Sequence, residues 1–125
     1  MVLKNFYTIE KKETLNENTS YAFDILINNK HTIFEGHFPG NPIMPGVCMM
    51  QITKDIVEDL TNSKLFMKKC SNVKFMAIIN PDINKNLHLK IDIKFDENGD
   101  VKVKQSTKFE DTVALKLSVV YKKVS

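Results

Sequence analysis

Apolar and polar residues alternate over two long stretches of the chain, and this alternation predicts β-strands at residues 86–95 and 113–121. A strand of this kind buries one face and exposes the other. Shorter stretches of similar character predict four more strands, at residues 6–10, 20–28, 72–80 and 100–109. Between two of the predicted strands lies Asn98-Gly99, which predicts a type I′ hairpin turn.

A different periodicity governs residues 47–60, where apolar residues recur every three or four positions. They stand at positions 49, 52, 56 and 60, with two more at 50 and 57. This spacing predicts a helix with a wide apolar face. Because residues 47–50 are all apolar, we expect the first turn to be buried nearly all round, with the polar residues gathered toward the C-terminal end.

One long helix and about six one-sided strands predict an α+β architecture. In it an antiparallel sheet curls round the central helix, so that both elements bury their apolar faces in one core. The strands after the helix are joined by short turn segments, which suits a meander. We expect a single domain over residues 1–125. A half-wrapped helix leaves an edge that a second copy can cover, so we also expect a homodimer.

The composition is that of an ordinary folded protein, with 42% hydrophobic and 26% charged residues among 125. It excludes disordered, collagen-like and disulfide-scaffold classes. No apolar run approaches the roughly 18 residues that span a bilayer, and the first residues lack the apolar stretch of a signal peptide. We therefore expect a cytoplasmic protein. Its cysteines, Cys48 and Cys70, are expected to be free thiols, and neither has metal-ligand spacing.

All eighteen basic residues are lysines, and the net charge is +3. Without arginine the chain lacks the forked donor that most often reads guanine and clamps phosphate, which argues against nucleic acid as a partner. Along the chain the lysines are interspersed with acidic residues, as on a solvated surface.

Glycine and proline are concentrated in one segment, residues 36–46, with the sequence GHFPGNPIMPG. It holds six of the eight glycines and prolines in the chain. Proline fixes the backbone and glycine permits conformations that other residues avoid, so the segment is predicted to be a rigid loop of specific shape.

The segment HFPGNPIMPGV at residues 37–47 resembles the motif of the hot-dog-fold 3-hydroxyacyl-[acyl-carrier-protein] dehydratases of type II fatty-acid synthesis. Weaker similarity extends from residues 20–28 through Val73-Lys74-Phe75 and Pro81 to the final strand. The resemblance implies a hot-dog fold. It also implies an enzyme that eliminates water from a 3-hydroxyacyl thioester to give the trans-2-enoyl thioester.

The resemblance also implies roles for individual residues. His37 would remove a proton from C2 of the thioester, and the backbone N–H of Gly46 would stabilise the charge on the thioester oxygen. Substrate contacts would come from Phe38, Pro45, Val47 and Phe75.

The same resemblance implies partners. The substrate would arrive on the phosphopantetheine arm of an acyl-carrier protein, with no metal or redox cofactor. Surface lysines Lys68, Lys69 and Lys74 could contact an acidic carrier protein.

The sequence departs from the family at the second catalytic position, fourteen residues after the histidine. The family has Glu or Asp there, and this chain has Gln51, whose amide cannot donate a proton as an acid does. Losing such an acid typically costs about 10² to 10⁴ in rate. Asp55 could substitute, or His37 could act alone with Gln51 as an orienting group. The chain could also be a non-catalytic subunit that binds acyl-carrier protein and needs a catalytic homologue.

Two other chemistries are conceivable from the same region. A hot-dog thioesterase would need Asp55 or Glu35 to activate water. Cys48, in the first helical turn near His37, could act as a nucleophile, although its apolar neighbours favour a buried core residue. His31 and His88 are expected on the surface.

Overall fold

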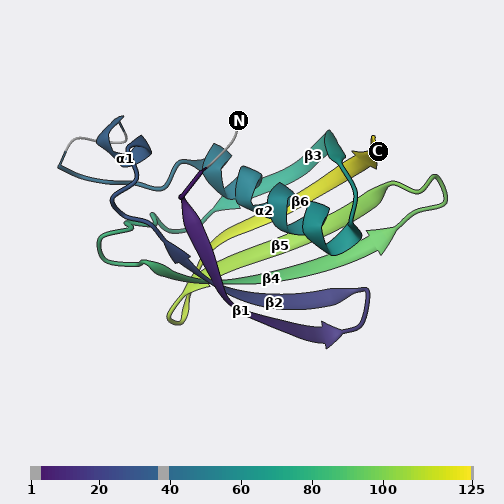
Figure 1. Ribbon diagram of the computed structural model, residues 1–125, viewed down its shortest axis with the longest axis horizontal. Coiled ribbons are helices and arrows are strands. Elements are labelled where there is room, and N and C mark those ends of the chain that lie inside the picture. Colours follow the sequence, from purple (N-terminus) through teal and green to yellow (C-terminus); the bar gives the residue numbers. More distant parts are fainter. Residues whose placement is uncertain (1–3, 37–39, 125) are drawn as a thin grey trace.

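The computed structural model describes residues 4–36 and 40–124. One antiparallel sheet has the strand order β1-β2-β4-β5-β6-β3, and the long helix α2 lies across one of its faces (Figure 1). The elements are β1 (Tyr7–Asn16), β2 (Ser20–Ile27), α1 (Ile33–Gly36), α2 (Gly46–Thr61), β3 (Leu65–Phe75), β4 (Asn86–Phe95), β5 (Val101–Phe109) and β6 (Thr112–Lys123). The expected α+β architecture is confirmed. In the part of the chain described, no helix is long and apolar enough to cross a membrane.

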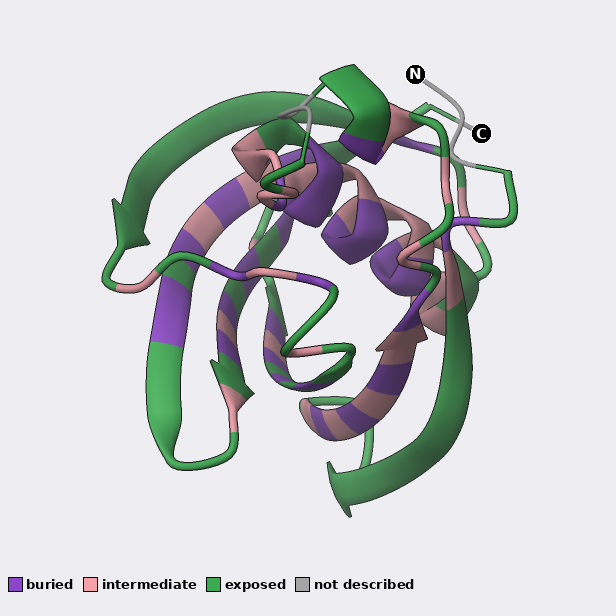
Figure 2. Ribbon diagram, turned by 90° about the vertical axis from the view of Figure 1, so that its left-hand side faces the viewer, coloured by how far each residue is buried: buried purple, intermediate pink, exposed green. Residues whose placement is uncertain are grey.

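The core lies between α2 and the concave face of the sheet. Alternate residues of β2, β4, β5 and β6 are buried, as is one side of the helix. Figure 2 shows the buried segments alternating along strands that curve round the helix. Ile52 of the helix and Ile91 of β4 are both fully buried. The two edge strands, β1 and β3, are almost wholly exposed.

The helix has nearly the predicted bounds. It begins after Pro45, whose backbone is extended, and it ends at Asn62, whose left-handed conformation directs its N–H to the carbonyl of Asp59. The expectation that the first turn is buried nearly all round is wrong for the single chain. Cys48 is fully buried, but Val47 is 59% exposed. The first turn therefore has one open side.

The strand after the helix lies earlier than predicted. The prediction places it at residues 72–80, whereas β3 spans Leu65–Phe75 and starts soon after α2 ends. Two register shifts, at Met67/Lys69 and Cys70/Asn72, interrupt its pairing with β6. These irregularities and the exposure of both faces remove the alternation that reveals a strand in a sequence.

The first strand is longer than predicted, for a similar reason. β1 runs over Tyr7–Asn16 instead of residues 6–10. Among the described strands it pairs only with β2, and its own burial pattern shows no buried side chain. An edge strand without a buried face carries no hydrophobic period.

The turn between β4 and β5 is not the predicted type I′ turn. That type needs two left-handed residues, and in this turn only Gly99 has a positive φ, of 79°. The N–H of Gly99 donates to the carbonyl of Asp96 at 3.0 Å, and the N–H of Asp96 donates to the carbonyl of Asp100. This is a type I turn closed by a glycine bulge. The carboxylate of Asp96 accepts two further backbone N–H groups, which fixes the longer loop.

A small polar network is buried between α2 and β5. The hydroxyl of Thr53 donates to the carbonyl of Met49 at 2.8 Å and accepts the amide N–H of Gln105 at 2.9 Å. The carbonyl of the Gln105 side chain accepts the hydroxyl of Thr107 at 2.7 Å. Thr53, Gln105 and Thr107 are each at most 2% exposed. The network therefore joins helix and sheet, and each of its three side chains has a hydrogen-bond partner.

We expect Thr53→Val to destabilise the fold by about 1 to 3 kcal/mol, because it leaves the Gln105 amide N–H buried without an acceptor. Urea unfolding followed by circular dichroism measures the change. The matched control is the triple substitution Thr53→Val, Gln105→Leu and Thr107→Val, which removes the whole network and should recover part of the loss. Equal stability of Thr53→Val and wild type would contradict this account.

Candidate functional site

The N-terminus of α2 is the first component of the site. Pro45 precedes the helix, and its carbonyl accepts the N–H groups of Cys48 and Met49. No side chain of the described residues caps this end. Within the same part of the chain, the N–H groups of Gly46 and Val47 have no acceptor. They carry the partial positive charge of a helix N-terminus and can stabilise an anionic oxygen.

An aromatic ring from the edge strand lies on this helix start. A Cβ atom added at Gly46 would be 2.7 Å from Cζ of Phe75, so only glycine leaves room for the ring. Phe75 is 51% exposed and pairs with Leu115, a residue that faces the helix. The helix N-terminus is thus flanked by a half-exposed aromatic side chain that a bound apolar chain could contact.

Four of the predicted site residues are accounted for in this region, and two are not. Gly46, Pro45, Val47 and Phe75 come together at the start of α2. The predictions for His37 and Phe38 lie outside the described residues.

Gln51 and Asp55 form a hydrogen-bonded pair one helical turn apart. The amide Nε2 of Gln51 donates to Oδ1 of Asp55 at 2.8 Å. Because a carboxylate only accepts, the amide nitrogen must face Asp55, and the amide oxygen of Gln51 is left to accept from a bound molecule. Asp55 therefore acts on this region through Gln51.

A cavity of about 180 Å³ opens along one face of the helix. Its walls are Val47, Met50, Gln51 and Lys54 from α2, with Met67 from β3 and Tyr121 from β6. The helix residues follow the 3, 1, 3 spacing of a single face. Asp55 does not line this cavity but a separate open hollow of about 460 Å³ at the C-terminal part of the helix.

Sequence reasoning missed Lys54 and Tyr121. The alternation assigned Tyr121 only to the buried face of a strand, and the one available signal was a phenol at a position where the alternation calls for an aliphatic residue. Lys54 gave no signal, because a lysine on a helix is ordinarily solvated. The pairing of β3 with β6 brings Met67 and Tyr121 together beside the helix face that carries Lys54.

Two phenols near the helix are held in their protonated form. Burial, with the carboxylates of Asp55 and Asp59 adding to it, raises the pKa of Tyr7 to about 12. Burial also raises the pKa of Tyr121, with smaller contributions from Cys70, Glu58 and Asp55. Tyr121 therefore lines the cavity as a neutral phenol.

Other candidates have structural explanations. Cys48 is fully buried, and burial raises the pKa of its thiol, which disfavours the reactive thiolate. His31 is half-buried; its ring packs edge-on against Phe6, and its two nitrogens contact the Lys4 carbonyl and the Ile33 N–H. His88 is exposed and pairs with the carboxylate of Asp24.

The structure also places the remaining candidates, the cysteines, Lys68 and Glu35. Both cysteines are free, as predicted. Lys68 Nζ lies 2.6 Å from the carboxylate of Asp100, which raises the pKa of Lys68 through that hydrogen bond and engages it within the fold. Glu35 is exposed on α1. Among residues 4–36 and 40–124, no group of three His, Cys, Asp or Glu side chains could hold a metal ion.

Together these groups suit the stabilisation of an anionic oxygen beside an apolar surface. A family model described as ApeI dehydratase, for the ApeI-like family, matches residues 11–118. The chain belongs to the ApeI-like dehydratase family. The 3-hydroxyacyl-[acyl-carrier-protein] dehydratase FabZ of Lactobacillus helveticus (strain DPC 4571) is 27% identical over 130 residues, covering 96% of this chain and 86% of the relative. The FabZ of Rickettsia massiliae (strain Mtu5) is 33% identical over 67 residues, 47% of this chain and 46% of the relative.

Solved structures give the same fold. The dehydratase heterocomplex ApeI:P from Xenorhabdus doucetiae matches with a TM-score of 0.76 and 21% identity, covering 91% of this chain and 96% of that one. A hypothetical thioesterase with coenzyme A from Streptococcus pneumoniae TIGR4 matches with a TM-score of 0.68 and 9% identity, over 95% and 86% of the two chains. The hot-dog fold and the dehydratase-like character expected from the sequence are confirmed.

Proposed function

We propose that this chain eliminates water from a 3-hydroxyacyl thioester carried on acyl-carrier protein, and yields the trans-2-enoyl thioester. The observation that carries the proposal is the N-terminus of α2 at Gly46, within the 37–47 motif. No side chain of the described residues caps it, and the next residue, Val47, lines a cavity with an apolar wall. A 3-hydroxyacyl thioester needs these features, because its carbonyl oxygen gains negative charge when C2 loses a proton.

The proposed steps balance without a metal or redox cofactor. His37 takes the proton from C2, and the thioester oxygen gains charge against the N–H of Gly46. The C2–C3 double bond forms as the C3–O bond breaks, and the departing hydroxyl takes a proton to leave as water. That proton comes from His37, now an imidazolium. The amide oxygen of Gln51 accepts a hydrogen bond from the 3-hydroxyl and orients it, and Asp55 holds the Gln51 amide.

The partners and place of action are part of the proposal. The substrate arrives on a phosphopantetheine arm, whose apolar acyl chain would pass Phe75 and Val47. Lys69 and Lys74 are exposed on β3, but their pairing with Val120 and Lys116 places them on the outer face of the sheet, away from α2, and Lys68 is engaged with Asp100. The lysines of β3 are therefore not part of the proposed carrier contact. We propose that the reaction takes place in the cytoplasm, where both cysteines would stay reduced.

The exposed edge strand supports a dimer as part of this proposal. Within the described chain, β3 leaves its outer backbone edge unpaired and carries exposed apolar side chains, among them Phe66 at 62% and Phe75 at 51%. Such an edge pairs readily with another strand. The second subunit is a copy of this chain or a homologue, as in the ApeI:P heterocomplex. Sedimentation equilibrium over a range of concentrations tests the homodimer, and a monomer throughout would favour the homologue.

A second function is favoured by one observation, the amide at position 51. A dehydratase-like subunit without its acid could bind the carrier-linked acyl chain and depend on a catalytic homologue for turnover. The thioesterase alternative has less support, since Asp55 is hydrogen-bonded to Gln51 and does not line the cavity.

The deciding experiment incubates the purified chain with a carrier-linked 3-hydroxyacyl thioester and, separately, with the 2-enoyl thioester. Mass spectrometry follows the gain or loss of water in both directions. Interconversion by the chain alone supports the enzyme. Binding of the carrier-linked substrate without interconversion supports the subunit, and release of free acid supports the thioesterase.

We expect Gly46→Ala to lower kcat/KM about tenfold, because the new Cβ displaces the Phe75 ring and disturbs the N–H that faces the thioester oxygen. Stability should change by less than about 1 kcal/mol, since alanine favours a helix and Phe75 can turn toward solvent. The control is Gly46→Ala in a Phe75→Ala background. An equal loss from Gly46→Ala in both backgrounds would show that the ring is not responsible.

A further inference from the structure

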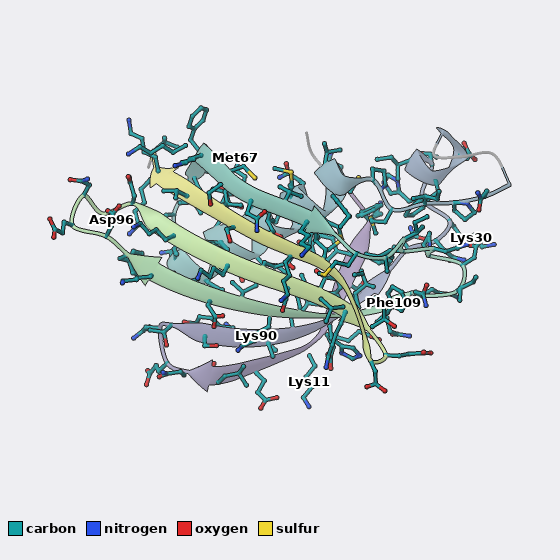
Figure 3. All side chains as sticks on the ribbon, turned by 180° about the vertical axis from the view of Figure 1, so that it is seen from behind. Lys11, Lys30, Met67, Lys90, Asp96 and Phe109 are labelled. Atoms are coloured by element: carbon teal, nitrogen blue, oxygen red, sulfur yellow. The ribbon has the colours of Figure 1, made fainter. Side chains whose placement is uncertain are left out.

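The lysines that alternate with buried residues along β4, β5 and β6 all lie on the outer face of the sheet, opposite α2. Seven outward positions of these strands hold lysine, against one aspartate: Lys90, Lys94, Lys102, Lys104, Lys108, Lys116 and Lys122, with Asp92. Figure 3 looks onto this face, with the three strands in front of the helix. We call it the lysine face.

The charge of the molecule is strongly divided. Removing the lysine face from the eighteen lysines and fifteen carboxylates of the chain leaves eleven lysines against fourteen carboxylates. A net charge of only +3 therefore hides a strongly positive face and a negative remainder. Even within the face the cross-strand register sets Lys94 directly opposite Lys102, an arrangement that costs stability. The single carboxylate, Asp92, accepts a hydrogen bond from Ser20 at 2.7 Å.

The centre of the lysine face is slightly hollow. An open depression of about 530 Å³ lies over β4, β5, β6 and β3, and Lys69, Lys94, Lys102 and Lys104 stand around it. At the β3 edge of the same face, Phe66 pairs with Lys122 and is 62% exposed. The face thus combines a broad field of ammonium groups with an exposed aromatic side chain at its margin.

We infer that the lysine face binds an anionic lipid surface. The charge is spread over three adjacent strands, which matches an extended anionic plane better than one narrow strand of nucleic acid. Lysine is a flexible point charge that suits non-specific attraction to headgroups, and the chain has no arginine for forked recognition. An exposed aromatic beside lysines is typical of interfacial binding.

The position of the face argues against the carrier protein as its occupant. The whole sheet separates the lysine face from α2, Gly46 and the 180 Å³ cavity (Figures 1 and 3). A carrier that docked there could not deliver its arm through the sheet. Attachment by the lysine face leaves the helix side open, so that lipid binding and thioester binding are compatible. The inference is independent of the proposed reaction.

The test is co-sedimentation of the full chain with phosphatidylcholine vesicles that contain or lack phosphatidylglycerol. We expect association with the anionic vesicles alone, and its loss in about 1 M salt, where the Debye length falls to about 3 Å. Lys102→Glu with Lys104→Glu should weaken association at least about tenfold. The matched control, Lys30→Glu with Lys64→Glu, makes the same charge change away from the lysine face. It should alter association with anionic vesicles less than about twofold.

Each outcome of these experiments supports or overturns the inference. Circular dichroism and unchanged thioester binding show that the variants are folded. Absence of binding to anionic vesicles, equal binding to neutral ones, or full binding by the Lys102→Glu, Lys104→Glu variant would overturn the inference. Binding to soluble polyglutamate without binding to vesicles would also overturn it, and would assign the lysine face to an acidic protein.

Discussion

Gln51→Glu is expected to accelerate dehydration by about 10² or more, because it restores a carboxyl group where the related enzymes have their acid. The structure adds a reason. The new carboxyl would stand against Asp55, where the Gln51 amide now makes a 2.8 Å contact. Two carboxylates this close share a proton, so one of them has a raised pKa and stays protonated nearer to neutral pH. Steady-state rates on the carrier-linked substrate, measured against pH, test the expectation.

The pH profile provides the control for Gln51→Glu. A group that works in its protonated form loses activity as the pH rises through its pKa, so a raised pKa keeps the variant active to higher pH. Adding Asp55→Asn removes the neighbouring charge and should return the pKa of the introduced carboxyl toward the ordinary value for glutamate, about 4.3, with roughly tenfold less activity at a pH of about 7. A folded Gln51→Glu protein with no gain at any pH would contradict the proposed site.

His37→Ala is expected to lower kcat by about 10² to 10⁴, since it removes the proposed base for the C2 proton. Binding of the carrier-linked acyl chain should persist, because the proposed binding groups lie on α2 and β3. The measurement pairs turnover with a binding titration of the same carrier. The matched control is His88→Ala, an exposed histidine paired with Asp24 on the outer side of the sheet.

Turnover by His37→Ala at the wild-type rate would remove His37 from the mechanism. If His37→Ala loses both carrier binding and turnover, the result would instead indicate that His37 shapes the loop. A His88→Ala protein as impaired as His37→Ala would show that the assay reports stability, which a melting curve would confirm. The two substitutions differ in sequence context but make the same chemical change.

Much of the fold follows from patterns that each element carries by itself. The periodicity predicts helix α2 to within one residue at each end, because one of its faces is continuously buried. Alternation predicts β4 and β6, and their burial patterns reproduce it. Edge strands lack this information. The prediction misplaces β3 because its bulges break the period and both of its faces are exposed.

The site divides along the same line. Gly46, Gln51 and Asp55 are close in sequence, and the Gln51–Asp55 contact follows from the four-residue repeat of a helix. Tyr121, Met67 and the ring of Phe75 reach the helix only through the pairing of β3 with β6. A local pattern cannot show which strand becomes the neighbour of which. The sequence also does not reveal the lysine face. Its lysines are spread over three strands and separated by buried residues along the chain, and only the sheet brings them together on one face.

The strand order has a consequence for how the molecule is made. β3 follows α2 directly in sequence, yet among the described strands its only partner is β6, the last one in the chain. During synthesis β3 must therefore wait, without this partner, until the C-terminal segment leaves the ribosome. Contacts between residues so far apart in sequence close a large loop and form slowly. The wall of the cavity is thus completed at the end of folding, and a chain that stops before β6 would hold every motif residue without a site.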